Sequence, residues 1–143
     1  MDRLFNGLRK KGIKLSPFLE IGAERTQCSM VLKNYYNADG FAVDLSKDML
    51  QFAGVILKPL GFKKMPIRVC CDAYNLPFRN NVFPFVFCYE TLHHFPEPTP
   101  VILEIKRVMQ KGGFFLLASE PIKRKLKMKL WTVGHRMDKI ENC

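Results

Sequence analysis

The stretch SPFLEIGAERTQCS, residues 16 to 29, predicts a buried strand that runs into a tight turn. The segment from Phe18 to Ile21 is largely apolar, and Gly22 stands where the chain would leave the sheet. A turn that cradles a cofactor usually carries two or three glycines, because its backbone must come close to the ligand. The later positions of this turn hold Glu24 and Thr26 instead. The stretch is therefore compatible with a cofactor site, a degraded one, or an ordinary strand end.

The composition is that of a globular protein. Of the 143 residues, 48% are hydrophobic and 25% are charged, so we expect one domain over residues 1 to 143. No apolar run approaches the length of a membrane span, and basic residues interrupt the first 14 positions, which lack the core of a signal peptide. The five cysteines show no C-x-x-C spacing, which argues against a disulfide framework or a metal site. These features predict a cytoplasmic protein without a bound metal.

The formal net charge of +10 invites a nucleic-acid partner, but its distribution disfavours one. Half of the excess lies between Pro121 and Cys143, where seven Lys and Arg residues face two acids. A terminal basic segment is more often a solvated helix face than a nucleic-acid groove. Residues 122 to 143 read as a basic amphipathic segment, in which apolar residues at helical spacing from Ile122 to Met137 predict a helix that covers the sheet.

Short apolar runs alternate with segments of helical periodicity, which is the pattern of βαβ units in a parallel sheet. We expect strands at residues 18–22, 41–44, 66–72, 83–89 and 114–119. We expect helices at 26–37, with Leu32 and Tyr35 on its apolar stripe, at 46–59, with Ser46 as N-cap, and from Thr99 as N-cap to Gly112 as C-terminal glycine.

Polar residues stand at the carboxyl ends of these strands, which is where ligands bind in open parallel sheets. They are Glu20 and Gly22 in the first strand, Asp44 in the second, Asp72 in the third, and Tyr89 and Glu90 in the fourth. A single acid at a strand end is more often a simple cap, but three acids at matching ends favour a binding site.

With these residues in place, the segment from about Pro17 to Pro121 resembles the class I S-adenosylmethionine-dependent methyltransferases, and their type 11-like group in particular. LEIGAE is similar to the family's first motif, and GFAVDLSKDML to its second strand with the ribose-binding acid. CDAYNLPF is similar to the adenine-side segment, FVFCYETLHHFPEP to the fourth strand and the helix after it, and EIKRVMQKGGFFLLASEP to the last helix, double-glycine turn and fifth strand. Five such segments in the right order make the match specific.

The resemblance implies an α/β fold, a three-layer Rossmann-like sandwich with a parallel sheet in the order 3-2-1-4-5. It implies methyl transfer from S-adenosyl-L-methionine (SAM) to an unidentified small-molecule acceptor. Asp44 would hold the ribose and Asp72 the adenine amine. The full set of implied cofactor contacts is Glu20, Gly22, Ala23, Asp44, Leu45, Asp72, Ala73 and Tyr89. Because family members usually add two further strands, we expect a C-terminally truncated chain with its motif-bearing core at residues 17–121.

A nicotinamide-dinucleotide site is the main competitor within this fold. That fingerprint needs G-x-G-x-x-G so that the pyrophosphate can sit on a helix N-terminus, whereas Gly22 is the only glycine of this turn and Glu24 would repel a pyrophosphate. A sulfonium cofactor carries a positive charge and no phosphate, so the acids favour SAM. If the position of Thr26 needs a positive φ angle, its β-branched side chain will be strained there.

The two histidines of LHHF are candidates for catalysis, because they come after the fourth strand at the mouth of the expected site, near Tyr89. His93 or His94 could serve as a general base for a hydroxyl or amine nucleophile. The structural alternative is that the segment packs a helix onto the sheet, with Leu92 and Phe95 inward. Methyl transfer depends chiefly on in-line positioning, so a base is not obligatory.

A non-catalytic relative that keeps the fold as an interaction module is the alternative function. It is favoured by the altered glycine turn, by Pro84 in place of a family acid, and by the missing last strands. The fifth strand, FFLLAS at 114–119, is apolar and uncharged. If it lies at the edge of the sheet, we expect self-association or pairing with a partner segment there.

Overall fold

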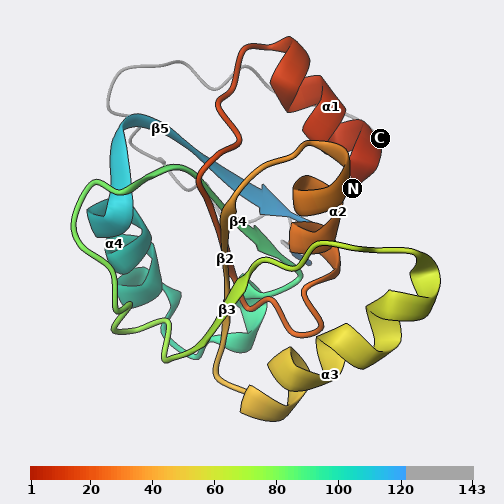
Figure 1. Ribbon diagram of the computed structural model, residues 1–143. Helices are drawn as coiled ribbons and strands as arrows, with labels where there is room; N and C mark the ends of the chain where they lie inside the picture. The colour runs from red at the N-terminus through yellow and green to blue at the C-terminus, as the bar shows by residue number, and fades with distance from the viewer. Residues whose placement is uncertain (122–143) are drawn as a thin grey trace.

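The computed structural model of the protein describes residues 1 to 121, apart from the side chains of residues 56 to 58. Its centre is a sheet of five parallel strands in the order β3-β2-β1-β4-β5, which confirms the expected topology (Figure 1). The strands are β1 (Phe18–Ile21), β2 (Gly40–Asp44), β3 (Ile67–Cys70), β4 (Phe83–Tyr89) and β5 (Met109–Ala118). The helices are α1 (Asp2–Lys10), α2 (Gln27–Tyr35), α3 (Lys47–Leu57), α4 (Pro98–Val108) and the short 3₁₀ turns η1 (Lys58–Leu60) and η2 (Leu92–His94).

Helices cover both faces of the sheet and produce the expected three layers (Figure 1). Side chains alternate along each strand, so Phe18 and Phe87 pack against α1 and α2, while Leu19 and Val86 pack against α4. Because β1 and β4 are covered on both sides, all their residues except Tyr89 are buried. This double burial explains why both strands read as nearly continuous apolar runs.

Helix α1 is an element that the sequence analysis did not predict. Its two buried residues, Phe5 and Leu8, lie three positions apart and so share one face of the helix. The Phe5 ring meets the rings of Phe85 and Phe87 edge-on, with centroids 6.2 and 5.6 Å apart. The helix therefore closes the aromatic half of the core.

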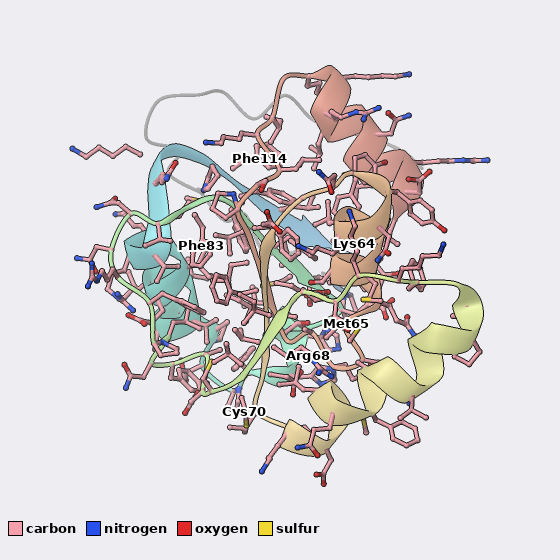
Figure 2. The ribbon with its side chains drawn as sticks, viewed as in Figure 1. Lys64, Met65, Arg68, Cys70, Phe83 and Phe114 are labelled. Carbon is pink, nitrogen blue, oxygen red and sulfur yellow. The ribbon has the colours of Figure 1, made fainter. Side chains whose placement is uncertain are left out.

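The chain returns from α3 to β3 through a loop that is fixed to α2. The Asn34 side chain accepts hydrogen bonds from the backbone N–H groups of Lys63 and Lys64, both at 3.0 Å, and donates to the Lys64 carbonyl at 2.8 Å. Met65 packs beside buried Met30, and Figure 2 shows Lys64 and Met65 next to α2. These contacts hold β3 at one edge of the sheet, where its carboxyl end joins those of β2 and β1.

Two expected boundaries at helix α4 and strand β3 were wrong. Strand β3 ends at Cys70 and not at Asp72, so Asp72 lies on the loop after the strand. Helix α4 begins at Pro98 after Glu97, which makes no side-chain capping bond, and not after Thr99. Proline is tolerated in the first turn of a helix, because the backbone N–H that it lacks would have no partner within the helix there.

The expected role of Gly112 as a helix terminator was also wrong. Helix α4 ends at Val108, and Met109 is already extended. Gly112 lies inside β5 with a φ angle of +73°. The pairing of β5 with β4 shifts register between Phe83 and Phe85, around Pro84, which has no N–H to give to a ladder. Gly112 therefore provides the positive φ angle that β5 adopts near this register shift, and it does not end a helix.

Two further expectations concern the helices. Tyr35 was expected on the buried stripe of α2 but is 66% exposed, with its ring against that of Phe62 at 5.9 Å. The helix expected from Ile122 to Met137 lies outside the described residues. Within residues 1 to 121, no helix combines the length and the apolar character needed to cross a membrane.

Candidate functional site

The carboxyl ends of β1, β2 and β4 open onto a cleft of about 900 Å³. A cleft of this size is typical of sites for small molecules and cofactors. All eight residues that the family resemblance implies as cofactor contacts line it, as do the two histidines: Glu20, Gly22, Ala23, Asp44, Leu45, Asp72, Ala73, Tyr89, His93 and His94. The convergence results from the parallel sheet, which brings the strand ends to one edge.

The floor of the cleft is a close contact between Gly22 and Thr91. Gly22 has a φ angle of +67°, and a Cβ atom on it would lie 2.1 Å from the Thr91 methyl group. The Thr91 hydroxyl lies 3.2 Å from the Gly22 carbonyl oxygen and 2.9 Å from that of Tyr89. Glycine is therefore required at residue 22 by the packing of β4's end against β1's turn. The sequence analysis did not single out Thr91.

The turn after Gly22 keeps a glycine-like backbone without glycines. Glu24 and Thr26 have φ angles of +46° and +58°, in the left-handed region that is unfavourable for β-branched residues. Thr26 is completely buried, and its hydroxyl has no hydrogen-bond partner within residues 1 to 121. The position of Thr26 does need a positive φ angle, and the residue is strained.

Asp44 joins this turn to the end of β2. One carboxylate oxygen accepts a hydrogen bond from the Glu24 N–H at 2.8 Å, and the other accepts one from the Ser46 N–H at 2.8 Å. Ser46 in turn caps α3 by accepting from the Met49 N–H at 3.3 Å, as expected. Each carboxylate oxygen has two lone pairs, so Asp44 retains acceptor capacity toward a ligand.

Glu20 lies at the back of the cleft with 3% of its surface exposed. Its carboxylate accepts hydrogen bonds from the backbone N–H of Ser29, at 3.0 Å, and from the Ser29 hydroxyl, and so ties β1 to the start of α2. Burial raises the pKa of Glu20 to about 7, although the Ser29 hydrogen bonds act in the opposite direction. The neighbouring Cys28 thiol has its pKa raised by the same burial.

Two aromatic side chains form a rim over the Asp72 end of the cleft. The Asp72 carboxylate accepts from the Tyr74 N–H at 2.9 Å, which turns the chain back over buried Ala73. The rings of Tyr74 and Phe95 meet edge-on with centroids 5.5 Å apart, and both residues line the cleft. Sequence reasoning missed Tyr74 and placed Phe95 only in the core.

A clamp from α4 fixes the loop that carries Asp72. The Arg107 guanidinium donates to the carbonyl oxygens of Leu76 and Phe78, at 2.8 and 2.7 Å. Glu104 accepts from the Leu76 N–H at 2.8 Å and from Arg107, whose hydrogen bond holds the pKa of Glu104 below its ordinary value. The loop is thereby positioned by part-buried polar contacts that span 28 to 31 residues of sequence.

The cleft is rich in carboxylates. Glu20, Glu24, Asp44, Asp72 and Glu90 line it, and no lysine of residues 1 to 121 does. Arg25 also lines it, with a buried Nε that has no hydrogen-bond partner in the described part of the chain and lies 3.7 Å from the Glu24 carboxylate. Such a lining suits a cationic ligand with one carboxylate and is unfavourable for a phosphate.

The segment LHHF forms the 3₁₀ turn η2 and not the helix that was expected after β4. Leu92 is buried and Phe95 packs against the core, while His93 and His94 line the cleft with ring centroids 4.0 Å apart. The segment therefore both packs onto the sheet and presents imidazoles to the cleft. No cluster of three possible metal ligands occurs within residues 1 to 121.

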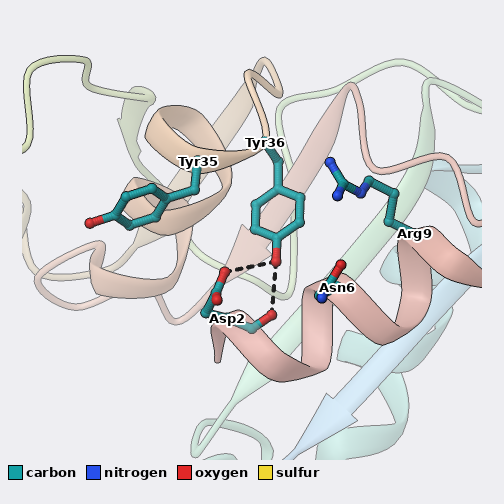
Figure 3. Close-up of a pocket in the computed structure, with 5 residues that line it drawn as sticks. All are labelled: Asp2, Asn6, Arg9, Tyr35 and Tyr36. Atoms are coloured by element: carbon teal, nitrogen blue, oxygen red, sulfur yellow. Dashed lines mark hydrogen bonds between the residues drawn. The ribbon is translucent and has the colours of Figure 1, made fainter.

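A second hollow, of about 510 Å³, lies between α1 and α2 (Figure 3). Figure 3 shows Tyr36 donating from its hydroxyl to the Asp2 carboxylate and carbonyl, both at 2.8 Å, with Arg9 beside the ring. The polar groups of Asp2 and Tyr36 are thus already hydrogen-bonded to each other, and the hollow lies away from the strand ends. The cleft at the strand ends is therefore the candidate site.

Replacing Thr26 by glycine should raise the free energy of unfolding by about 1 kcal/mol, because relief of backbone strain and removal of an unpaired buried hydroxyl outweigh the lost methyl contacts. Thr26→Ala retains the backbone strain but lacks the hydroxyl, so its free energy of unfolding should lie between those of wild type and Thr26→Gly. Ser29→Ala, which removes a buried hydroxyl that is hydrogen-bonded, should lose roughly 1–2 kcal/mol. Urea unfolding measures all four proteins, and a glycine variant less stable than wild type would contradict the assignment.

Glu20 should make the protein less stable as pH rises. With a pKa of about 7 in the folded protein against an ordinary 4.5, Glu20 holds a proton that the unfolded chain releases. Its stabilising contribution is complete below pH 4.5 and is lost as pH rises through 7, by roughly 3 kcal/mol at most. The measurement is the difference in unfolding free energy between wild type and Glu20→Gln across this range. Parallel curves for the two proteins would refute the prediction.

Comparison with known proteins agrees with this geometry. The family model described as "Methyltransferase domain" matches residues 19–117. The uncharacterized methyltransferase YcgJ of Bacillus subtilis is 27% identical over 99 residues, which is 69% of this chain and 38% of YcgJ. The crystal structure of YcgJ aligns with a TM-score of 0.65 at 25% identity and covers 78% of this chain and 48% of that one.

Two other proteins extend the comparison. Malonyl-[acyl-carrier protein] O-methyltransferase of Halorhodospira halophila is 27% identical over 119 residues, which is 82% of this chain and 39% of that protein. An S-adenosylmethionine-dependent methyltransferase of Clostridium acetobutylicum shares the fold, with a TM-score of 0.64 at 21% identity over 81% of this chain and 47% of that one. This chain spans less than half the length of the curated relatives that it matches. The match over residues 19–117, together with the five-stranded sheet and its cleft, shows that the chain belongs to the class I methyltransferase family.

Proposed function

We propose that the protein binds S-adenosylmethionine in the cleft and transfers its methyl group to a small-molecule acceptor. The observation that carries this proposal is the carboxylate-rich lining around a left-handed turn that offers no phosphate site. Bound SAM supplies an electrophilic methyl group on a positively charged sulfur. The same lining disfavours a nucleic-acid substrate, whose phosphates the acids would repel.

The residues present fit this cofactor. Asp44, with its remaining lone pairs, would accept the ribose hydroxyls, and Asp72 would accept the adenine amine beside Ala73 and below the Tyr74 ring. The buried Nε of Arg25 would find in the methionine carboxylate the partner that the described residues do not supply. In this proposal Gly22 and Ala23 bring backbone to the methionine end, Leu45 flanks the ribose, and the ammonium group lies on the side of Glu20.

One contribution of the chain's own residues to transfer is positioning. Tyr89 and Glu90, at the end of β4, lie at the end of the cleft, beside the contact of Thr91 with Gly22. Their side chains would direct an acceptor in line with the methyl group, which supplies most of the acceleration in such reactions. An acceptor that is a small molecule is consistent with the mainly acidic lining of the cleft.

A non-catalytic interaction module remains the second candidate. It is favoured by the strained Thr26, whose hydroxyl has no hydrogen-bond partner among residues 1 to 121. Left-handed backbone at a β-branched residue costs stability that a ligand-binding turn with glycine would not lose. The two candidates differ in cofactor binding, which calorimetric titration measures. The proposed cellular site in either case is the cytoplasm, because the five cysteines of the sequence lack the spacing of a disulfide framework.

Isothermal titration of the 143-residue chain with SAM and with S-adenosylhomocysteine should show binding of both. Asp44→Ala should weaken that binding by about 10- to 100-fold, the effect of losing charge-assisted hydrogen bonds to a ligand. Asp48→Ala, an exposed acid on α3 outside the cleft, is the matched control and should bind as wild type does. Folded wild type without detectable binding refutes the cofactor proposal. Equal binding by Asp44→Ala refutes only the assignment of Asp44.

The outer edge of β5 is, in this proposal, a docking site for a strand of a second copy of the chain. Among the described strands β5 pairs only with β4, and Phe115 and Leu117 on it are only partly buried against the core. Sedimentation at about tens of micromolar should show association. Leu117→Lys should reduce it, with melting measured to separate this effect from lost packing, whereas Leu103→Lys on the exposed face of α4 should not. A wild-type chain that stays monomeric would disprove the docking site.

A further inference from the structure

Glu120 makes a set of contacts that the proposed cofactor site does not use. Its side chain is only 4% exposed and lies two residues beyond the end of β5. The carboxylate accepts hydrogen bonds from three successive backbone N–H groups of η2 and its cap, those of Thr91 at 2.7 Å, Leu92 at 2.8 Å and His93 at 3.1 Å. The same carboxylate lies 2.8 Å from the Nδ1 atom of His93. Glu120 thus holds both the turn and one edge of the imidazole.

The protonation of this pair is determined by its hydrogen bonds. Burial alone would raise the pKa of Glu120, but the hydrogen bonds from the His93 ring and from three N–H groups outweigh it, so the pKa lies below its ordinary value. An ionised carboxylate can only accept hydrogen bonds, so the proton between the two groups belongs to His93 Nδ1. In the neutral imidazole the lone pair is then on Nε2, on the ring edge that faces away from Glu120.

The open edge of His93 lies in the cleft. His93 lines it with a side chain that is 35% exposed, and the His94 ring lies against its ring. The turn η2 begins directly after Thr91, whose hydroxyl contacts Gly22, the residue assigned above to the methionine end. Glu90 and Tyr89 line the same end of the cleft. A fixed proton acceptor therefore stands where an acceptor molecule would approach.

We propose that His93, oriented by Glu120, takes the proton of the methyl acceptor, and that the acceptor is therefore a compound whose nucleophilic atom carries a removable proton, as in a hydroxyl or a thiol compound. This inference rests on the proposed methyl transfer. The acceptor's oxygen or sulfur forms a bond to the methyl carbon, the bond from that carbon to the sulfonium sulfur breaks with its electron pair remaining on sulfur, and the acceptor's proton passes to His93 Nε2. The Glu120 carboxylate balances the imidazolium charge until the proton leaves to water. His93 is the catalytic residue, and Glu120 is a positioning residue.

The first test reads the ring itself and needs no cofactor. Nitrogen NMR of the 143-residue chain is recorded at a pH at which the histidines are neutral, and the His93 signals are assigned by their loss in His93→Gln. The spectrum should show His93 protonated on Nδ1. In Glu120→Gln the amide oxygen can still accept from the turn, but its NH₂ group faces Nδ1, so the ring should change to the Nε2-protonated form. Glu97→Gln, an exposed residue outside the cleft, should leave the tautomer unchanged. A wild-type His93 protonated on Nε2, or a tautomer insensitive to Glu120→Gln, overturns the proposal.

The second test uses labelled SAM with a phenol and an aryl thiol as protic probes and a pyridine as a probe without a removable proton. His93→Gln should lower kcat for the protic probes about 100-fold or more and leave transfer to the pyridine unchanged. Glu120→Gln should lower kcat for the protic probes with little change in KM, and Glu97→Gln should act as wild type does. Undiminished transfer by His93→Gln, or a SAM-binding chain that methylates no protic probe, overturns this inference alone. Absence of SAM binding in the titration refutes the proposed function and this inference together.

Discussion

The contact between Thr91 and Gly22 is the constraint on which the cleft depends. It joins the ends of β1 and β4, leaves no room for a Cβ atom at residue 22, and places the Thr91 hydroxyl against the carbonyl oxygens of Gly22 and Tyr89. The packing of Thr91 thus requires a glycine at residue 22, whatever the role of this residue toward a ligand. A larger residue at either position would separate β1 from β4 and change the cleft at its floor.

Two carboxylates stabilise the turn after Gly22, which contains no further glycine. Asp44 accepts the Glu24 N–H, and Glu20 accepts an N–H group of the first turn of α2 at Ser29. Both bonds hold the turn in its left-handed course despite the side chains of Glu24 and Thr26. The consequence is electrostatic, because a turn held by acids presents negative potential to a ligand. In the proposed function, this negative potential favours a cationic cofactor.

The positive net charge of the chain gives no guide to this site. The cleft is acidic although the whole sequence carries +10, since its lining comes from strand ends and their loops. Local chemistry therefore decides which ligands the cleft accepts. The same holds at His93, which lines the cleft and whose Nδ1 atom lies 2.8 Å from the buried Glu120 carboxylate.

The pattern of residues predicts a parallel sheet, the bounds of β4 and the residues that converge on the cleft, whereas the strand order followed from the resemblance to the methyltransferase family. Strands buried on both faces are apolar throughout, and parallel strands must end at one edge, so residues such as Asp44 and Asp72 meet whatever the details of packing. Helix α1 was not predicted because three apolar residues, Leu4, Phe5 and Leu8, in a short and largely polar segment are a weak signal of a helix. Gly112 was misassigned because a positive φ looks the same in sequence at a helix end and at a strand irregularity. The contacts of Thr91, Arg107 and Glu120 became visible in the folded structure alone, because each side chain meets atoms of a distant segment. No local sequence pattern records which side chain a buried donor will meet.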